Sequence, residues 1–284
     1  MKRILTAIVL IPLVLFLVFL GPRWQWLISL ATAGVAAVAA WEFLGLARRA
    51  GTNPPRIAVI VAIVALFAAR LFADWFELLR QSEAVFAMLA IALLIYCAFS
   101  SPIPEVMADA SVSVFCLFYI GFTLATLPAM HEDTEVSGAS LITFLLCVVW
   151  AGDTAAMYVG RALGRHKLAP ALSPNKTWEG SIASIAGSLL ATVGLIELST
   201  LLAGWNIERL TFHGDSWAWW LILAVVVNIA AQVGDLVESA LKRSAGVKDS
   251  GSLLPGHGGV LDRIDALLLA APVLWYAQLI HQRF

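Results

Sequence analysis

The segment SWAWWLILAVVVNIAAQVGDLVESAL, residues 216–241, has the length and composition of a membrane-spanning helix. About 20 consecutive apolar residues in a helix cross the ~30 Å hydrocarbon core of a bilayer. Asp235 and Glu238 are its charged residues, and both lie near its C-terminal end. A charged side chain persists in a span where a bundle interior or a site accommodates it. The segment therefore predicts an all-α membrane fold with a polar interior.

Similar apolar segments recur along the whole chain. Hydrophobic residues make up 61% and charged residues 13% of the 284 residues, and the mean hydropathy is +0.87, far from a soluble globular domain. The 18 basic and 19 acidic residues nearly cancel, so net charge indicates no class of partner, and nucleic acid is not an expected one. Backbone groups in lipid must be satisfied internally, which predicts a polytopic transmembrane helical bundle. We expect about nine spans, near residues 4–20, 24–46, 56–73, 84–99, 111–129, 139–160, 180–203, 216–241 and 262–281.

The basic residues predict how these spans are oriented. If the N-terminus lies on the side of the even-numbered loops, 13 of the 18 basic residues lie on that side. The positive-inside rule then places the N-terminus in the cytoplasm, with residues 4–20 as a retained first helix rather than a signal peptide. We expect a multi-pass protein of the cell (inner) membrane. Residues 1–130 would be N-terminal transmembrane helices and residues 131–284 a transmembrane catalytic region.

The segment from Ser239 to Asp265 is rich in charges and glycine. Asp262 and Asp265 are three residues apart and share one helix face, where both carboxylates can bind one metal ion. Ligands that are all oxygen favour Mg²⁺, or Mn²⁺. Stabilisation of a helix N-terminus by both aspartates is the structural alternative. Further candidate site residues of this segment, by their charge, their hydrogen-bonding groups or their flexible backbone, are Ser239, Lys242, Arg243, Lys248, Asp249, His257, Gly258, Gly259 and Arg263.

A polar stripe leads into this segment. Gln232, Asp235, Ser239 and Lys242 follow one another at steps of three, four and three residues, so they share one face of an otherwise apolar helix. We assign Asp235 to the same metal site as the two later aspartates. A hydrogen bond between neighbouring helices is the alternative for this carboxylate.

A second polar group lies before residue 180. Asp153 falls inside the sixth predicted span, where function is the default hypothesis and polar helix packing the alternative. In Ser173-Pro174-Asn175-Lys176, Ser173 can cap or turn, Pro174 suits a first helical position, and Lys176 can meet a phosphate. An ion pair between Lys176 and Glu179 stays open as the alternative. This loop and loop 242–263 are both even-numbered loops, so the predicted orientation puts them on the same face of the membrane. Its candidate binding residues are Asp153, Ser173, Asn175 and Lys176.

Residues 239–265 resemble the signature of the phosphatidate cytidylyltransferases, also called CDP-diacylglycerol synthases. The earlier region around Asp153, Gly160-Arg161 and Ser173–Gly180 also resembles motifs of that family, whereas the N-terminal third is similar only in being hydrophobic. The residues that carry the resemblance are Ser239, Lys242-Arg243, Lys248-Asp249, Pro255, His257-Gly258-Gly259, Asp262-Arg263 and Asp265.

The resemblance implies that CTP and phosphatidate react in the membrane, with Mg²⁺, to give CDP-diacylglycerol and pyrophosphate for phospholipid biosynthesis. It suggests a homodimer, with the active site facing the cytoplasm. Within this reaction we assign Asp235, Asp262 and Asp265 to the metal, with Asp249 less certain. The cations assigned to phosphates are Lys242, Arg243, Lys248, Arg263 and Lys176, although the resemblance does not sort nucleotide cations from lipid cations. His257, Gly258 and Gly259 would shape the triphosphate loop. Three alternatives remain: a CTP-dependent kinase of a polyprenol or phytol, a cytidylyltransferase for another lipid phosphate, and a transporter, which the clustering of charges at one face disfavours.

Overall fold

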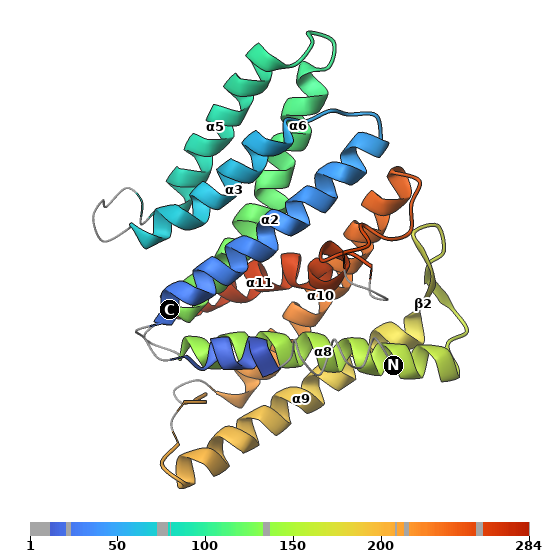
Figure 1. Cartoon of the computed structure of the whole chain (residues 1–284). Helices are drawn as coiled ribbons and strands as arrows, with labels where there is room; N and C mark the ends of the chain where they lie inside the picture. Colours follow the sequence, from blue (N-terminus) through green and yellow to red (C-terminus); the bar gives the residue numbers. More distant parts are fainter. Residues whose placement is uncertain are drawn as a thin grey trace. The chain divides into compact units, whose positions relative to one another are not determined.

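The computed structural model is almost entirely helical over the residues that it describes, which are 12–20, 24–72, 79, 81–132, 137–207, 209–212, 216–253 and 258–283 (Figure 1). The helices are α2 Gln25–Arg49, α3 Arg56–Leu71, α5 Ser82–Ser100, α6 Val106–Cys116, the π-helix η2 Leu117–Phe122, α7 Thr123–His131, α8 Gly138–Leu163, α9 Trp178–Gly204, α10 Trp217–Ser244 and α11 Leu261–His281. Two short strands, β1 Lys167–Ala169 and β2 Ser173–Thr177, pair as an antiparallel hairpin.

The predicted all-α membrane fold is confirmed. Within the described ranges, seven helices are long and apolar enough to cross a membrane, against about nine expected. The predicted span 4–20 lies mostly outside the described residues. The predicted span 56–73 becomes α3, whose 16 residues fall short of the ~20 that a span needs. The spans predicted from residue 84 onward each coincide with a helix or, for 111–129, with the continuous run Val106–His131.

The chain divides into two compact units. Unit 1 comprises Met1–Leu10, Pro22–Pro128 and Leu241–Ile264, and unit 2 comprises Ile11–Gly21, Ala129–Ala240 and Asp265–Phe284. The helices α7, α10 and α11 each begin in one unit and end in the other. The predicted division at residue 130 separates catalytic from other helices, which this grouping into units does not test.

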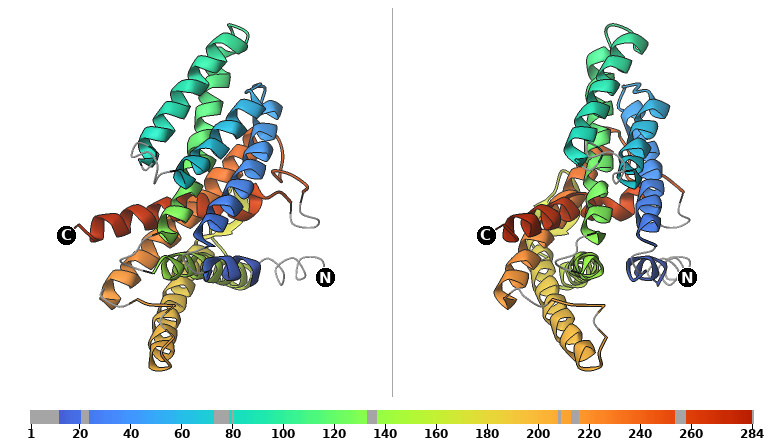
Figure 2. Two further views of the ribbon diagram at one scale, coloured as in Figure 1. Left: turned by 60° about the vertical axis from the view of Figure 1, so that its left-hand side comes forward. Right: turned by 90° about the vertical axis from the view of Figure 1, so that its left-hand side faces the viewer.

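The helices α2, α3, α5 and α6 of unit 1 lie side by side in both views of Figure 2. Aromatic rings of the π-helix η2 and its neighbours fill the space between them. Phe115 stacks on Tyr119 with ring centroids 5.3 Å apart, and Phe43 of α2 lies 5.7 Å from Phe115. Large aromatic side chains bury much apolar area each, so this cluster fixes η2 against α2.

A buried aspartate joins the loops of unit 1. Asp109 of α6 is 1% exposed. Its two carboxylate oxygens accept hydrogen bonds from the backbone N–H of Asn53 and from Oγ of Ser101, both at 2.8 Å. The first donor lies in the loop before α3 and the second directly follows α5. A buried carboxylate requires such donors, so Asp109 is a structural residue of this unit.

In unit 2, α8 and α9 pack closely through small residues. A Cβ atom at Gly187 would lie 2.7 Å from Cβ of Ala155, and one at Gly180 would lie 3.0 Å from the carbonyl oxygen of Ala156. Glycine and alanine at such positions let two membrane helices approach each other closely, which favours van der Waals packing where no hydrophobic effect drives association.

A buried polar network links α9 to α10 in the same unit. The side-chain amide of Asn228 donates to Oγ of Ser184 at 2.9 Å and to Oγ of Ser188 at 2.8 Å. Gln232 Nε2 donates to Oδ1 of Asn228 at 2.7 Å, and Oγ of Ser181 donates to Oε1 of Gln232 at 2.5 Å. These bonds satisfy both amide side chains, so the helices are held in one register.

The hairpin before α9 corrects one prediction. Ser173 is predicted to cap a helix or to form a turn, and Pro174 to suit a first helical position, but both lie in strand β2. The helix begins after Thr177, whose Oγ1 accepts a hydrogen bond from the backbone N–H of Gly180 at 3.2 Å. A threonine with extended backbone is a favourable N-cap, so the cap lies four residues later than Ser173.

Gly152→Ala should destabilise unit 2. A Cβ atom at Gly152 would contact Nδ2 of Asn228 and would lie 2.8 Å from Oγ of both Ser184 and Ser188. Overpacking of this kind costs about 1–3 kcal/mol, or a melting temperature lower by roughly 3–10 °C in detergent. Gly194→Ala on α9 is the matched control, because nothing lies within 4 Å of its Cβ position. A melting temperature of Gly152→Ala equal to that of Gly194→Ala would contradict this packing.

Candidate functional site: two carboxylate–lysine clusters

The first cluster lies in unit 2 at the start of α9 and the later part of α10. Lys176 Nζ lies 2.6 Å from Oδ2 of Asp235 and 3.5 Å from the carbonyl oxygen of Gln232. Ser239 Oγ donates to Oδ1 of Asp235 at 3.5 Å. Lys176 of the hairpin thus contacts the polar stripe of α10. Its distance of 2.6 Å from Asp235 is that of a charge-assisted hydrogen bond.

Asp153 belongs to the same cluster. It lies on α8 inside a candidate span, as predicted, and it interacts electrostatically with both Asp235 and Lys176. Its side chain is exposed. One lysine thus faces two carboxylates, which leaves the cluster with an excess of negative charge able to attract a cation.

Glu179 does not pair with Lys176, so that alternative is wrong. Oε1 of Glu179 lies 2.7 Å from Nδ1 of His166, and both its oxygens accept from the backbone N–H of His166 at 3.2 and 3.3 Å. His166 had no predicted partner. The contact closes the base of the hairpin, because His166 directly precedes β1 and Glu179 lies in the first turn of α9. The hairpin residues Ser173 and Asn175 are half-buried and exposed, respectively.

The second cluster lies in unit 1 and centres on Asp262. Lys242 Nζ donates to Oδ1 of Asp262 at 2.7 Å. The backbone N–H groups of Ser250 and Gly259 donate to Oδ2 at 3.0 and 2.7 Å. The side chains of Lys242 and Asp262 are 13% and 7% exposed, so this is a nearly buried ion pair. Asp262 also lies in the first turn of α11, where a carboxylate interacts favourably with the helix dipole, as the structural alternative for it has it.

Gly258 has a conformation that favours glycine. Its φ is +80°, and a Cβ atom there would lie 2.6 Å from Oδ2 of Asp262. A side chain at this position would meet both backbone strain and a clash. Glycine therefore lets the loop lie against the Asp262 carboxylate.

Several charged residues of the segment lie close to Lys242 and Asp262 in the sequence. Arg243 donates to the carbonyl oxygen of Val247 at 3.3 Å, which shapes the turn after α10. Asp265 follows the first turn of α11 and belongs to unit 2, and its Oδ1 accepts from the backbone N–H of Ala266 at 2.8 Å. His257 lies outside the described residues. The exposed members of the predicted site are Arg243, Lys248, Asp249 and Arg263.

Sequence reasoning missed Glu42 of α2. This side chain is 8% exposed, and its Oε2 accepts from the backbone N–H of Leu261 at 2.8 Å and from Oγ of Ser250 at 3.3 Å. It thus contacts the signature loop from a helix of the N-terminal third. The signal was present, because Glu42 is a lone carboxylate within the predicted span 24–46, and charge inside a span indicates a function by default.

The donor set of these clusters is chemically suited to Mg²⁺. Carboxylate oxygens are its preferred protein ligands, and Asp235 and Asp262 each already hold a cationic ammonium group at 2.6 and 2.7 Å. Across the described residues, no three His, Cys, Asp or Glu side chains gather into a metal-binding group. Mg²⁺ usually takes one or two carboxylates together with substrate phosphates and waters, so the oxygen ligands present fit it.

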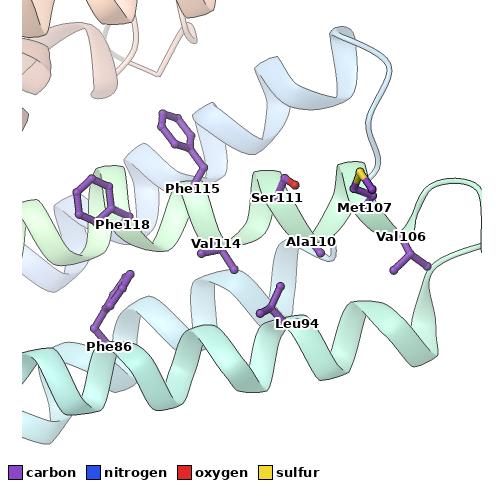
Figure 3. Close-up of a pocket in the computed structure, with 9 residues that line it drawn as sticks. All are labelled: Phe86, Leu94, Val106, Met107, Ala110, Ser111, Val114, Phe115 and Phe118. Carbon is purple, nitrogen blue, oxygen red and sulfur yellow. The ribbon is translucent and has the colours of Figure 1, made fainter.

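A separate apolar groove of about 680 Å³ lies in unit 1 between α5 and the run from α6 to η2. Figure 3 shows Phe86 and Leu94 of α5 facing Val114 and Phe118 across it. Ser111 is the polar residue of its lining. The nine described residues that line the groove carry no charge, in contrast to the two clusters above.

Comparisons with known proteins agree on one family. The profile described as "Cytidylyltransferase family" matches residues 1–281. The phosphatidate cytidylyltransferase of Haemophilus influenzae is 34% identical over 295 residues, covering 97% of each chain, and that of Staphylococcus haemolyticus is 32% identical over 272 residues, covering 96% of each. The phosphatidate cytidylyltransferase of Brucella suis is 45% identical over 159 residues, which is 56% of this chain; the chain spans about half, 54%, of that relative's length.

Lys242→Met should destabilise the protein strongly. It leaves the nearly buried Asp262 carboxylate without its ammonium partner, and breaking a buried pair in this way costs about 3 kcal/mol. Adding Asp262→Asn should restore part of that loss, because the charge is removed while an acceptor for Ser250 and Gly259 remains.

Lys176→Met is the matched control, because the side chains of the Lys176–Asp235 pair are 24% and 37% exposed and such pairs contribute about 1 kcal/mol or less. Thermal unfolding in detergent measures all four proteins. An equal fall in melting temperature for Lys242→Met and Lys176→Met, or no recovery of the melting temperature in the double variant, would refute the difference between the two ion pairs.

Proposed function

This chain belongs to the cytidylyltransferase family, and we propose that it transfers the cytidylyl group of CTP to phosphatidate, giving CDP-diacylglycerol and pyrophosphate. The relatives that it matches over 96–97% of its length are named phosphatidate cytidylyltransferases. The observation that carries the proposal is the Asp262 cluster. It lies within the matched range and combines a nearly buried lysine–carboxylate pair with loop amides, and three exposed cations lie close to it in the sequence; such groups are suited to phosphates.

The reaction needs charge neutralisation more than a strong base. A phosphate oxygen of the lipid, already anionic at neutral pH, attacks the α-phosphorus of CTP. A new P–O bond forms, the bond between the α-phosphorus and its bridging oxygen to the β-phosphate breaks, and the electron pair leaves with pyrophosphate. The barrier lies in bringing two anions together and in stabilising the charge that moves to the leaving group.

We assign the three exposed cations of the segment 239–265 to the phosphates of the substrates. Arg243, Lys248 and Arg263 are accessible, and guanidinium groups can bind phosphate oxygens in a bidentate manner. In unit 2, Lys176 is the candidate for a further phosphate contact. Ser239 and Asn175 are candidate hydrogen-bond donors to the substrates, and His257, Gly258 and Gly259 are assigned to the triphosphate loop.

We propose Mg²⁺, or Mn²⁺, as the cofactor. When bound, it would supply Lewis-acid neutralisation of the triphosphate. Asp262 and Asp265 on α11, and Asp235 on α10, are the proposed ligands. Two further carboxylates are Asp153, which interacts with Asp235, and Asp249 in the segment 239–265, which is the less certain ligand. Asp262 and Asp235 belong to different units, so their common role stays a prediction from the sequence. Their support is chemical: both hold cationic groups now, and both offer hard oxygen ligands.

The proposed setting is the cell (inner) membrane, with the site on the cytoplasmic side, where CTP is soluble. The seven helices able to span a membrane and the excess of basic residues on one predicted side support this placement. The lipid would reach the site without leaving the bilayer. A homodimer is proposed on the family resemblance alone.

The product assay should give a cytidine-labelled lipid. Purified protein in detergent, with Mg²⁺, phosphatidate and CTP labelled in the cytidine or at the γ-phosphate, is expected to put the cytidine label into lipid and the γ-label into pyrophosphate. A γ-label recovered in lipid would show a kinase and would exclude the proposed reaction. Chelation of the metal should stop turnover, and added Mg²⁺ should restore it.

Asp262→Asn and Asp265→Asn should each lower kcat by about 10²-fold or more, because each removes a negative oxygen ligand where charge develops. Glu197→Gln is the control, since this exposed carboxylate lies near the C-terminal end of α9, whereas the cluster of Lys176 lies at the start of that helix, and it should keep full activity. Turnover is compared at matched folded protein, judged by size-exclusion behaviour. Normal turnover in both aspartate variants would remove these residues from the metal site.

A further inference from the structure

Glu42 is a buried carboxylate with an unusual set of neighbours. It lies in the third quarter of α2, in unit 1 together with the loop 241–264. Its side chain is 8% exposed, and its Oε2 accepts from the first backbone N–H of α11, that of Leu261, at 2.8 Å. Burying a carboxylate costs free energy unless donors compensate it, so this contact has to be a specific one.

The carboxylates of Glu42 and Asp262 both accept hydrogen bonds from the loop between α10 and α11. Ser250 donates its hydroxyl to Glu42 at 3.3 Å and its backbone N–H to Asp262 at 3.0 Å. Gly259 donates its backbone N–H to Asp262, and its α-carbon faces the Glu42 carboxylate so closely that a Cβ atom would lie 2.8 Å from Cδ of Glu42. The loop is therefore held between Glu42 of α2 and Asp262 of α11.

Glycines make room for the Glu42 carboxylate. A Cβ atom at Gly251 would collide with Oε1 of Glu42 and lie 2.8 Å from its Cδ. No hydrogen-bond partner of Oε1 lies among the described residues. The loop backbone at Gly251 and Gly259 thus lies in van der Waals contact with the carboxylate, in addition to the hydrogen bonds of Ser250 and Leu261.

We propose that Glu42 is a positioning residue for the reaction: through Ser250 and the amide of Leu261 it fixes the signature loop and the start of α11, and so fixes the direction of the Asp262 carboxylate. This inference rests on the proposed function for its catalytic consequence, although the anchoring itself can be measured without activity. Glu42 does not contact substrate in this role. Its effect on rate comes from geometry, since small displacements of reacting groups cost rates heavily.

Kinetics provide the first test. Glu42→Ala should lower kcat for cytidylyl transfer by about tenfold to a hundredfold while the KM for CTP changes less than threefold or so. Glu42→Gln should recover most of that loss, because its amide oxygen can still accept from Leu261. Asp109→Ala is the matched control: it removes another buried carboxylate of unit 1 that ties loops, and it should lower the melting temperature but leave kcat unchanged.

Gly251→Ala tests the same contact from the loop. Its Cβ atom would displace the Glu42 carboxylate, so kcat should fall about tenfold, while Gly34→Ala on α2, where nothing lies within 4 Å, should have no effect. In the Glu42→Ala background, Gly251→Ala should cost little more, because its collision partner is gone. Additive losses in the double variant would refute the contact.

Amide hydrogen exchange is the readout that does not depend on activity. Peptides covering residues 245–262 should exchange about tenfold faster or more in Glu42→Ala, and not in Asp109→Ala, whose faster exchange should appear around Asn53. Unchanged exchange and kcat in Glu42→Ala would overturn the inference. If the unaltered protein made no cytidine-labelled lipid, the proposed function would fail, while the exchange data would still decide on the anchor. If Glu42→Ala did not fold, Glu42→Gln and Gly251→Ala would decide.

Discussion

The nearly buried carboxylate of Asp262 is the constraint on which the signature segment depends. An ionised carboxylate removed from water must be surrounded by donors, and here an ammonium and two backbone N–H groups supply them. Lys242 comes from the end of α10, Ser250 from the middle of the loop and Gly259 from the residues just before α11. One side chain thus fixes the two ends and the middle of a segment that would otherwise be an irregular loop.

The same requirement explains the other polar groups of this apolar chain. Where water is scarce, each polar side chain needs a partner, and the partners come from elements that must then be adjacent. Asn228 holds α10 to α9 through two serines, Lys176 holds the hairpin to α10 through Asp235, and Glu42 holds α2 to the signature loop. The apolar residues make the helices, and these few polar contacts decide which helix faces meet.

The sequence predicted the helices well because hydropathy and length determine a span. It drew attention to Asp153 and Asp235 because a charge in an apolar run stands out, and to Asp262 because the segment around it is rich in charges and glycine. It did not predict which partners those charges take. Lys176 has Glu179 three residues away, yet it pairs with Asp235, because the hairpin turns it toward α10 and gives Glu179 to His166 instead. Strands of three and five residues leave too weak a pattern to predict this turn. The partners of Glu42 were not predicted for a related reason, since the backbone N–H of Leu261 and the hydroxyl of Ser250 lie more than 200 residues away in the sequence and no local pattern reveals them.

The ion pair also divides the cations of unit 1 into two kinds. Lys242 is 13% exposed and already neutralises Asp262, so a phosphate that bound it would have to compete with a contact of 2.7 Å. Arg243, Lys248 and Arg263 are exposed, so in the proposed function they are the cations of this segment that an incoming triphosphate can reach. In the proposed function, electrostatic attraction of the nucleotide is therefore assigned to the exposed cations, whereas the nearly buried Lys242 holds the loop through Asp262. A charge in a signature motif can thus be retained for the geometry of its neighbours rather than for contact with substrate.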